Sequence, residues 1–251
     1  MRTTTYLGLI LGVTVIVLAV RAKGGDASLF TNSVALLIAL GGTVAATTLS
    51  SSRMTAVHAL SAMNRMFIAG AYNSGAIATE MIQLARLAKA QGISAIEPDD
   101  LKVKDAFLVK GLRLVADGVD PERLEELLRL ESSILSEKRA AAERMFRVMG
   151  TYSPMFGLVG TLIGLITMLK GLTDPRAIGH GMSIALMATF YGVLLAGLIF
   201  LPLAGKVRTM DLDERLQRDQ IIAGLLAIRL GQNAEYVRET LDVFTQRSAN
   251  A

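Results

Sequence analysis

The sequence predicts an all-α integral membrane protein with four transmembrane helices, a helical cytoplasmic domain between spans 2 and 3, and a helical cytoplasmic tail. Of its 251 residues, 52% are hydrophobic and the mean hydropathy is +0.46, which is too apolar for an ordinary soluble domain. The apolar residues gather into four blocks, each near the roughly 20 residues that span hydrocarbon. Between the blocks, charged stretches show helical periodicity.

The four blocks divide the chain into a pair of membrane hairpins, a central domain and a tail. A hairpin over residues 1–50 has spans at about 6–22 and 29–49, and a cytoplasmic helical domain fills 51–148. A second hairpin over 149–204 has spans at about 149–169 and 184–203, and a cytoplasmic tail covers 205–251. The first block is short enough to resemble a secretory signal, but no cleavage site follows it and a second block comes soon after.

The third span is expected to continue a helix that begins in the central domain. Asp120 is a suitable N-cap, Pro121 suits the first helical position, and acidic residues follow in the opening turns. Most basic residues lie in the central domain and the tail. The positive-inside rule therefore puts both chain ends on the cytoplasmic side of the membrane.

Several classes of function have little support in the sequence. Cysteine is absent, and the two histidines, His58 and His180, lie far apart. No metal-binding, phosphate-binding or nucleophile motif occurs, and no basic run interleaved with aromatic residues suggests nucleic acid. We therefore expect no enzyme activity, no metal and no cofactor.

Small residues line one face of each of the last two spans. In both spans these small residues recur three or four positions apart, as on one face of a helix. In the third span they are Gly150, Ser153, Gly157, Gly160 and Gly164, and in the fourth they are Gly181, Ala185, Ala188, Gly192 and Ala196. Such faces let membrane helices approach closely. Helix packing is therefore the first role expected of Gly157, Gly160, Gly164, Ala185 and Gly192.

Two threonines and two prolines in these spans suggest a function beyond helix packing. Thr161 and Thr189 sit among the small residues, with Thr161 expected near mid-membrane and Thr189 somewhat outside it. They could line one water-accessible path, or each hydroxyl could bond to its own helix. Pro154 and Pro202 should lie at a similar depth on the cytoplasmic side, where each removes a helix hydrogen bond and the pair suggests a hinge.

The four apolar blocks, the first taken from Tyr6 to Val20, contain no Asp, Glu, Lys, Arg or His. Because moving an ion through hydrocarbon usually requires an ionisable or coordinating group, this chain cannot carry a proton alone. If it belongs to an ion-driven machine, another chain must insert a carboxylate against the small-residue faces. The threonines would then serve as additional oxygen donors.

The last two spans contain the segments PMFGLVGTLIGLITMLKGLTDP and MSIALMATFYGVLLAGLIFLPLAGK, and the second span contains Gly41-Gly42-Thr43 with Ala45-Ala46. In these segments the chain resembles the MotA/PomA stator subunits of the bacterial flagellar motor. The resemblance implies an inner-membrane ring of five A subunits around two B subunits. The B chain would supply a membrane aspartate and a peptidoglycan anchor, and the complex would conduct H⁺ or Na⁺ and turn the rotor switch protein of the FliG type.

The same resemblance assigns roles to individual residues. Pro154 and Pro202 correspond to the family's coupling prolines, and Thr161 and Thr189 to threonines of the ion path. A basic and an acidic residue eight apart make Lys89 and Glu97 the rotor-contact candidates. The alternative is that this segment is only a solvated loop after a helix end. The family often has arginine at the first of these two positions.

Three points stay open at the level of sequence. Ala188 stands where sodium-type relatives tend to have a second threonine, so the coupling ion is undetermined. A TolQ/ExbB-like proton-channel subunit is the nearest alternative, but proteins of that type have three spans. A passive membrane scaffold held by glycine faces is another alternative, whereas a self-contained transporter would be expected to show duplicated halves.

Overall fold

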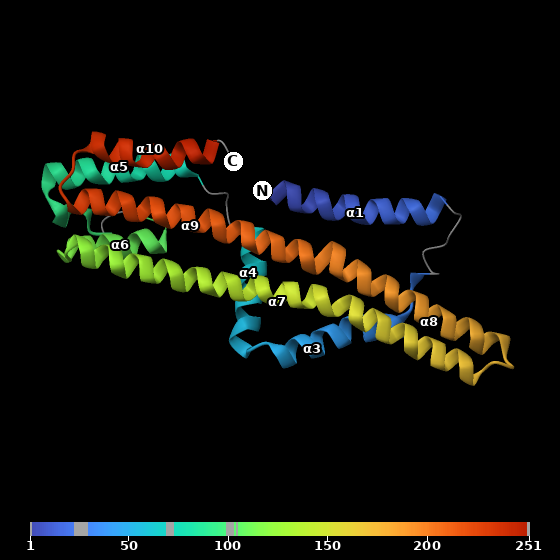
Figure 1. The fold of residues 1–251 in the computed structure, drawn as a ribbon. Coiled ribbons are helices and arrows are strands. Elements are labelled where there is room, and N and C mark those ends of the chain that lie inside the picture. The colour runs from blue at the N-terminus through green and yellow to red at the C-terminus, as the bar shows by residue number, and fades with distance from the viewer. Residues whose placement is uncertain (1, 23–29, 69–72, 99–102, 104, 250–251) are drawn as a thin grey trace. The chain divides into compact units, whose positions relative to one another are not determined.

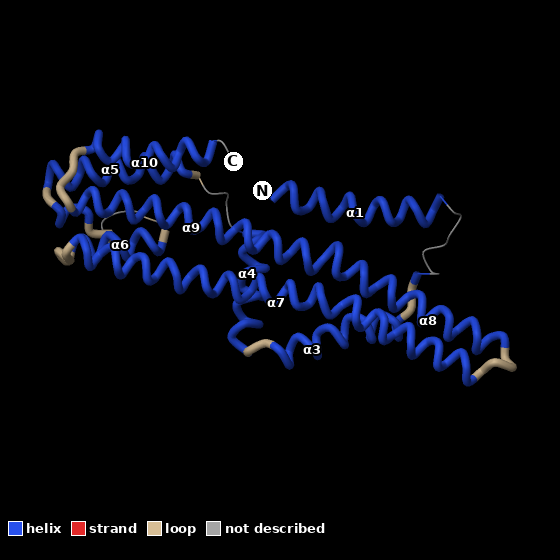
Figure 2. The backbone as a smooth tube through the Cα atoms, viewed as in Figure 1, coloured by secondary structure: helices blue, strands red, loops and turns tan. Residues whose placement is uncertain are grey.

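The computed structural model describes residues 2–22, 30–68, 73–98, 103 and 105–249, and helices account for nearly all of them (Figure 2). Figure 1 labels the main helices. In chain order the elements are α1 (Arg2–Ala22), α2 (Ser33–Leu36), the π-helical turn η2 (Leu37–Gly41), α3 (Gly42–Ser50), α4 (Arg53–Ile68), α5 (Ser74–Gln91), the 3-10 turn η3 (Ile93–Ile96), α6 (Ala106–Ala116), α7 (Pro121–Lys170), α8 (Pro175–Leu194), the π-helical turn η4 (Leu195–Phe200), α9 (Leu201–Arg229) and α10 (Ala234–Ala249).

Two compact units share this chain. The span unit comprises Met1–Gly70 and Lys138–Thr209, and the bundle unit comprises Ala71–Glu137 and Met210–Ala251. The helices α7 and α9 each contribute residues to both units. The bundle unit thus combines most of the predicted central domain with the predicted tail, because α9 and α10 pack in the same core as α5, α6 and the first part of α7.

Among the described residues, three helical stretches are long and apolar enough to cross a membrane. They are Ser33–Ser50, Pro121–Lys170 and Pro175–Arg229. The last two contain the predicted spans 149–169 and 184–203, and the first covers 33–49 of the predicted span 29–49. The described apolar part of α1, Ile10–Ala22, is shorter, so the first predicted span, over 6–22, stays a prediction.

The start of α7 agrees with the signals in the sequence. The helix begins at Pro121 and continues without a break to Lys170. The Asp120 carbonyl accepts the first helical hydrogen bond from the Leu124 N–H, at 2.8 Å. Proline is suited to this position because its missing N–H would have no partner in the first turn of a helix.

In the bundle unit, one turn of α9 holds three other segments through polar side chains, of which Arg218 and Gln220 are buried and Gln217 is partly buried. The Gln217 amide donates to the Asp105 carboxylate at 2.6 Å, and Asp105 caps the start of α6. The Arg218 guanidinium donates to the Ser136 hydroxyl of α7 at 2.8 Å. The fully buried Gln220 donates to the Ser74 carbonyl at the start of α5, at 3.0 Å. These bonds favour one arrangement of the helices around the apolar core, because another arrangement would leave buried polar groups without hydrogen bonds.

In the span unit, α7 and α8 form an antiparallel pair whose contact, here called the seam, is made by backbone. A Cβ built at Gly157 would lie 3.0 Å from the Ala188 carbonyl oxygen and 3.3 Å from the Gly192 Cα. Further along, a Cβ at Gly164 would lie 2.5 Å from the Gly181 carbonyl oxygen. Only glycine allows so close an approach.

The small faces of the two spans therefore pack against each other within one chain. The Ser153 hydroxyl adds a hydrogen bond across the seam to the Gly192 carbonyl, at 3.0 Å. Contrary to the expectation, these faces are not themselves the surface that receives a partner's carboxylate, because Gly157, Gly164 and Gly192 are already covered by the other span of the pair. Periodicity identified the packing faces but not their partners.

The seam predicts a specific sensitivity to a single methyl group. We expect Gly164→Ala to lower the free energy of unfolding by about 1–3 kcal/mol, because its Cβ would press on the backbone of Gly181 and on the Ala185 nitrogen, 2.6 Å away. Gly205→Ala in α9 is the matched control, since a Cβ there meets nothing within 4 Å. Thermal unfolding of the detergent-solubilised chain measures both, and equal losses would contradict the packing described.

Candidate functional site

Both threonines lie on the edge of the seam that faces away from the second span. The second span, formed by α2, η2 and α3, contacts α7 where Gly42 meets Phe156, and contacts α8 at Met187. At about 100° per residue, Thr161 lies about 140° around α7 from Phe156. By the same rule, Thr189 lies about 160° around α8 from Met187. The two side chains therefore share one edge, hereafter the threonine edge.

Each threonine hydroxyl is hydrogen-bonded to its own helix. Thr161 donates to the Leu158 carbonyl, and Thr189 donates to the Ala185 carbonyl at 3.3 Å. Thr189 is exposed and Thr161 partly so. Because a hydroxyl oxygen that donates its proton keeps two lone pairs, both oxygens can still accept a hydrogen bond or coordinate a cation.

The seam also fixes the order of the two threonines along the spans. Gly160 lies against Ala188, so Thr189 is level with a point between Leu158 and Gly160 on α7. Thr161 lies two or three residues further toward Lys170, about 4 Å at 1.5 Å per residue. The expected order, with Thr189 further out than Thr161, is therefore wrong, because the helix pair is offset from the alignment that span boundaries alone suggested.

The two prolines have different surroundings. Pro202 lies two residues after the end of η4. Leu201, the residue between them, caps η4, and its N–H bonds five residues back to the Ala196 carbonyl. This wider turn suits a helix that approaches a proline, since proline removes one donor and its ring presses on the preceding turn. Pro154 instead lies within the uninterrupted α-helix α7. The role of this pair as a hinge stays a prediction.

A polar contact at the start of the second span was not anticipated. The Tyr191 hydroxyl of α8 accepts the Asn32 N–H at 3.1 Å and donates to the Phe30 carbonyl, while the Asn32 amide donates to the Ser183 hydroxyl at 3.3 Å. Asn32 also caps α2. A tyrosine within an apolar span and an asparagine just before another were the available signals for this contact.

A second feature that sequence reasoning missed is the turn η2 in the second span. Its Ala39 packs against Leu195 and Phe200 of η4, so the two π-helical turns contact each other. The buried hydroxyl of Thr43 donates to the Ala39 carbonyl at 2.5 Å. The Thr43 hydroxyl thus satisfies the Ala39 carbonyl, which lies within the irregular turn. Such turns are common at functional sites, and Gly41-Gly42 directly beside this one was the visible signal.

The rotor-contact candidates lie at the end of α5 and just after η3. Lys89 and Glu97 are both exposed, and neither forms an ion pair with another residue that the structure describes. Between them Gly92 has φ +91°, a conformation that L side chains rarely adopt. This turn separates the two charges and leaves them both open to a partner.

One carboxyl group in the bundle unit has a perturbed pKa. Burial raises the pKa of Glu80 above its ordinary value, and the negative charge of Asp105 adds to the rise. The folded state is thus favoured by protonation of Glu80, a contribution that is lost as the pH rises through the raised pKa. Glu80 belongs to the bundle unit and does not supply the carboxylate that the spans lack.

The sequence of the chain is similar to that of known motility proteins. Residues 99–220 match the MotA/TolQ/ExbB proton channel family. A motility protein A of Cereibacter sphaeroides is 32% identical over 94% of this chain and 92% of its own length. The chemotaxis protein PomA of Vibrio alginolyticus is 29% identical over 100% of this chain and 98% of its own.

A solved structure resembles the fold along nearly the same length. The structure described as C. jejuni MotAB matches with a TM-score of 0.90 and 25% identity, and covers 97% of this chain and 96% of its own. The threonine edge, the glycine seam and the proline after η4 thus occur in a chain whose sequence and fold both match motility proteins. The chain belongs to the MotA/PomA family of stator A subunits.

Proposed function

We propose that this chain is a stator subunit of a bacterial flagellar motor, which forms an ion channel with a B-type partner and converts ion flow into torque on the rotor. It lies in the inner membrane with both ends on the cytoplasmic side and performs no catalytic step of its own. The observation that carries this proposal is a pair of spans closed against each other by glycine, with two hydroxyls on one open edge and no ionisable residue.

The partner's contribution follows from what the spans lack. An ion path needs an ionisable or coordinating group within the membrane, and the apolar parts of these spans contain none. The partner's transmembrane helix therefore brings the carboxylate, and its docking surface is the threonine edge. Support comes from the relative solved as MotAB, in which an A chain is paired with a B chain.

The threonine oxygens assist the ion as it passes the partner's carboxylate. A hydroxyl within hydrocarbon can accept a hydrogen bond from a hydrated proton or coordinate Na⁺ through its lone pairs. The separation of about 4 Å along the axis lets one ion meet the two oxygens in turn. The coupling ion is H⁺ or Na⁺, and we propose no other cofactor.

Torque reaches the rotor through the charges at the end of α5 and after η3. Lys89 and Glu97 are exposed with opposite signs, so they can pair with complementary charges on a rotor protein. The start of α5 is held to α9 by the Gln220 bond. Pro154 and Pro202 are the positions at which the ion-path helices can bend.

A TolQ/ExbB-like proton-channel subunit is the second candidate, because the matched family includes these proteins. The motility proteins match over nearly the whole chain, whereas the family match covers residues 99–220. The residues before 99 include the second span and α5 with Lys89. We therefore favour the flagellar function.

The threonine edge predicts a difference between two otherwise similar threonines. Thr161→Val in a complex with the B-type partner should lower ion flux roughly tenfold, the equivalent of about 1.4 kcal/mol, and Thr161→Ser should restore most of it. Thr167→Val is the matched control, because Thr167 also bonds to its own helix, at the Ile163 carbonyl, but lies on the opposite edge of the seam. Flux is measured in vesicles with and without the partner and across sodium concentrations. Equal fluxes for the two valine variants would refute the assignment.

Reversal of the two rotor charges should separate torque from ion flow. We expect Lys89→Glu with Glu97→Lys to abolish or strongly reduce rotation of tethered cells while flux and membrane insertion stay normal, since exposed substitutions usually change stability by less than about 0.5 kcal/mol. The control reverses the exposed pair Arg123 and Glu126 of α7, which form a salt bridge, and should leave rotation intact. Normal swimming of the first variant would count against these contacts.

A further inference from the structure

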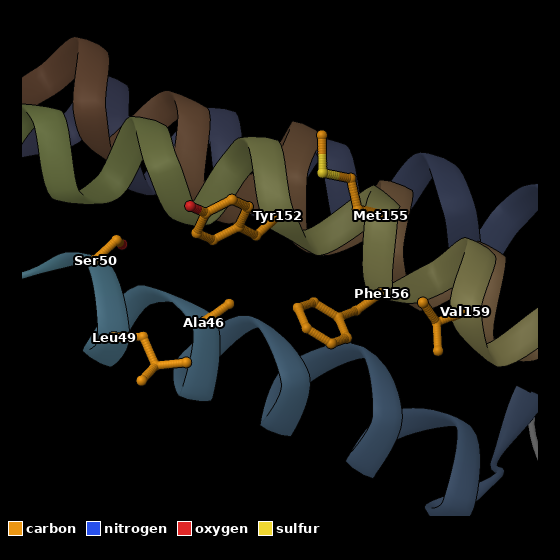
Figure 3. A pocket seen from close by; sticks show the side chains of 7 residues that line it. All are labelled: Ala46, Leu49, Ser50, Tyr152, Met155, Phe156 and Val159. Carbon is orange, nitrogen blue, oxygen red and sulfur yellow. The ribbon is translucent and has the colours of Figure 1, made fainter.

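An apolar groove runs between α3 and the middle of α7 (Figure 3). It has a volume of about 480 Å³, within the roughly 300–1,000 Å³ of sites that hold small molecules. Its floor lies beside the contact of Gly42 with Phe156. The seven lining residues are Ala46, Leu49, Ser50, Tyr152, Met155, Phe156 and Val159.

The groove is polar at one end and apolar along the rest of its length. Figure 3 shows the Tyr152 hydroxyl at the same end as Ser50, with Phe156 and Val159 further along α7. Ser50 is the last residue of α3. This end therefore coincides with the end of the second span, where tyrosine is commonly found at a membrane–water interface.

Two exposed arginines lie near the polar end along the chain. Arg53 begins α4 three residues after Ser50, so at most about 11 Å of chain separates the two Cα atoms. Arg53 is exposed and forms no ion pair with any residue that the structure describes. Arg144, eight residues before Tyr152 on α7, is also exposed. The neighbouring acid Glu143 is already paired with Arg147.

We propose that this groove binds an anionic phospholipid. One acyl chain lies between Ala46 and Val159, and the headgroup lies beside Tyr152 and Arg53. The occupant is a lipid because the walls belong to membrane-spanning segments and the charge at the open end is positive, which matches a molecule with a long apolar chain and a negative head. The lipid packs between the inner end of the second span and α7.

The test uses the full chain, produced with its partner, in vesicles that contain a photoreactive phosphatidylglycerol. We expect the label on the segments 46–50 and 152–159. Ala46→Trp, which fills the groove, should reduce this labelling at least fivefold. Val44→Trp is the control, because Val44 is exposed on the same helix but does not line the groove. The count of phospholipids retained by each purified variant, from native mass spectrometry, gives a second readout.

Arg53→Gln tests the charge. It should lower labelling by phosphatidylglycerol about fivefold, the factor expected for one arginine at an anionic surface, and leave labelling by a photoreactive phosphatidylcholine unchanged. Labelling that is even over all exposed apolar helices, or equal in the two tryptophan variants, would overturn the proposal. So would a cross-link showing that a second copy of this chain fills the groove. Ion flux in the same vesicles reports separately on the proposed function.

Discussion

The contact between bare backbones along the seam is the constraint on which the rest of the span unit depends. Gly157 and Gly164 of α7 lie against Gly192 and Gly181 of α8 without intervening side chains. Since lipid offers no hydrophobic force that favours helix association, close packing and hydrogen bonds such as that of Ser153 must hold the pair together. The seam fixes the offset of the two helices and their rotation. It thereby places the threonine hydroxyls on one edge and the second span on the other.

A division of chemical roles between the two units follows from this arrangement. The span unit has apolar helices with hydroxyls but no ionisable side chain in the apolar parts, so any charge that crosses must be met by another chain. The bundle unit has an apolar core that polar bonds from a single turn of α9 hold in one arrangement. It presents exposed charges of opposite sign at Lys89 and Glu97. In the proposed function, ion handling and rotor contact therefore depend on different residues, which can be varied independently.

The sequence predicted those features that depend on periodicity and local chemistry. The start of α7 at Pro121 and the glycine-lined faces of the last spans both follow from residue types at fixed spacing. The packing partner of those faces and the order of Thr161 and Thr189 depend on the offset between two helices, which spacing within each helix does not determine. The contact of Tyr191 with Asn32 joins residues far apart in the chain, so the polarity of each residue did not identify the other as its partner. Pro202 signalled an irregular turn, whereas the similar proline at 154 lies in an unbroken helix.

In the proposed complex, the partner's transmembrane helix docks on the threonine edge. Because the chain contains no cysteine, single cysteines can be placed on each edge of the seam and cross-linked to cysteines along the partner's helix. We expect Thr189→Cys to form a cross-link beside the partner's membrane carboxylate and Val159→Cys, on the edge of the second span, to form none. A cross-link from Val159→Cys without one from Thr189→Cys would contradict this docking.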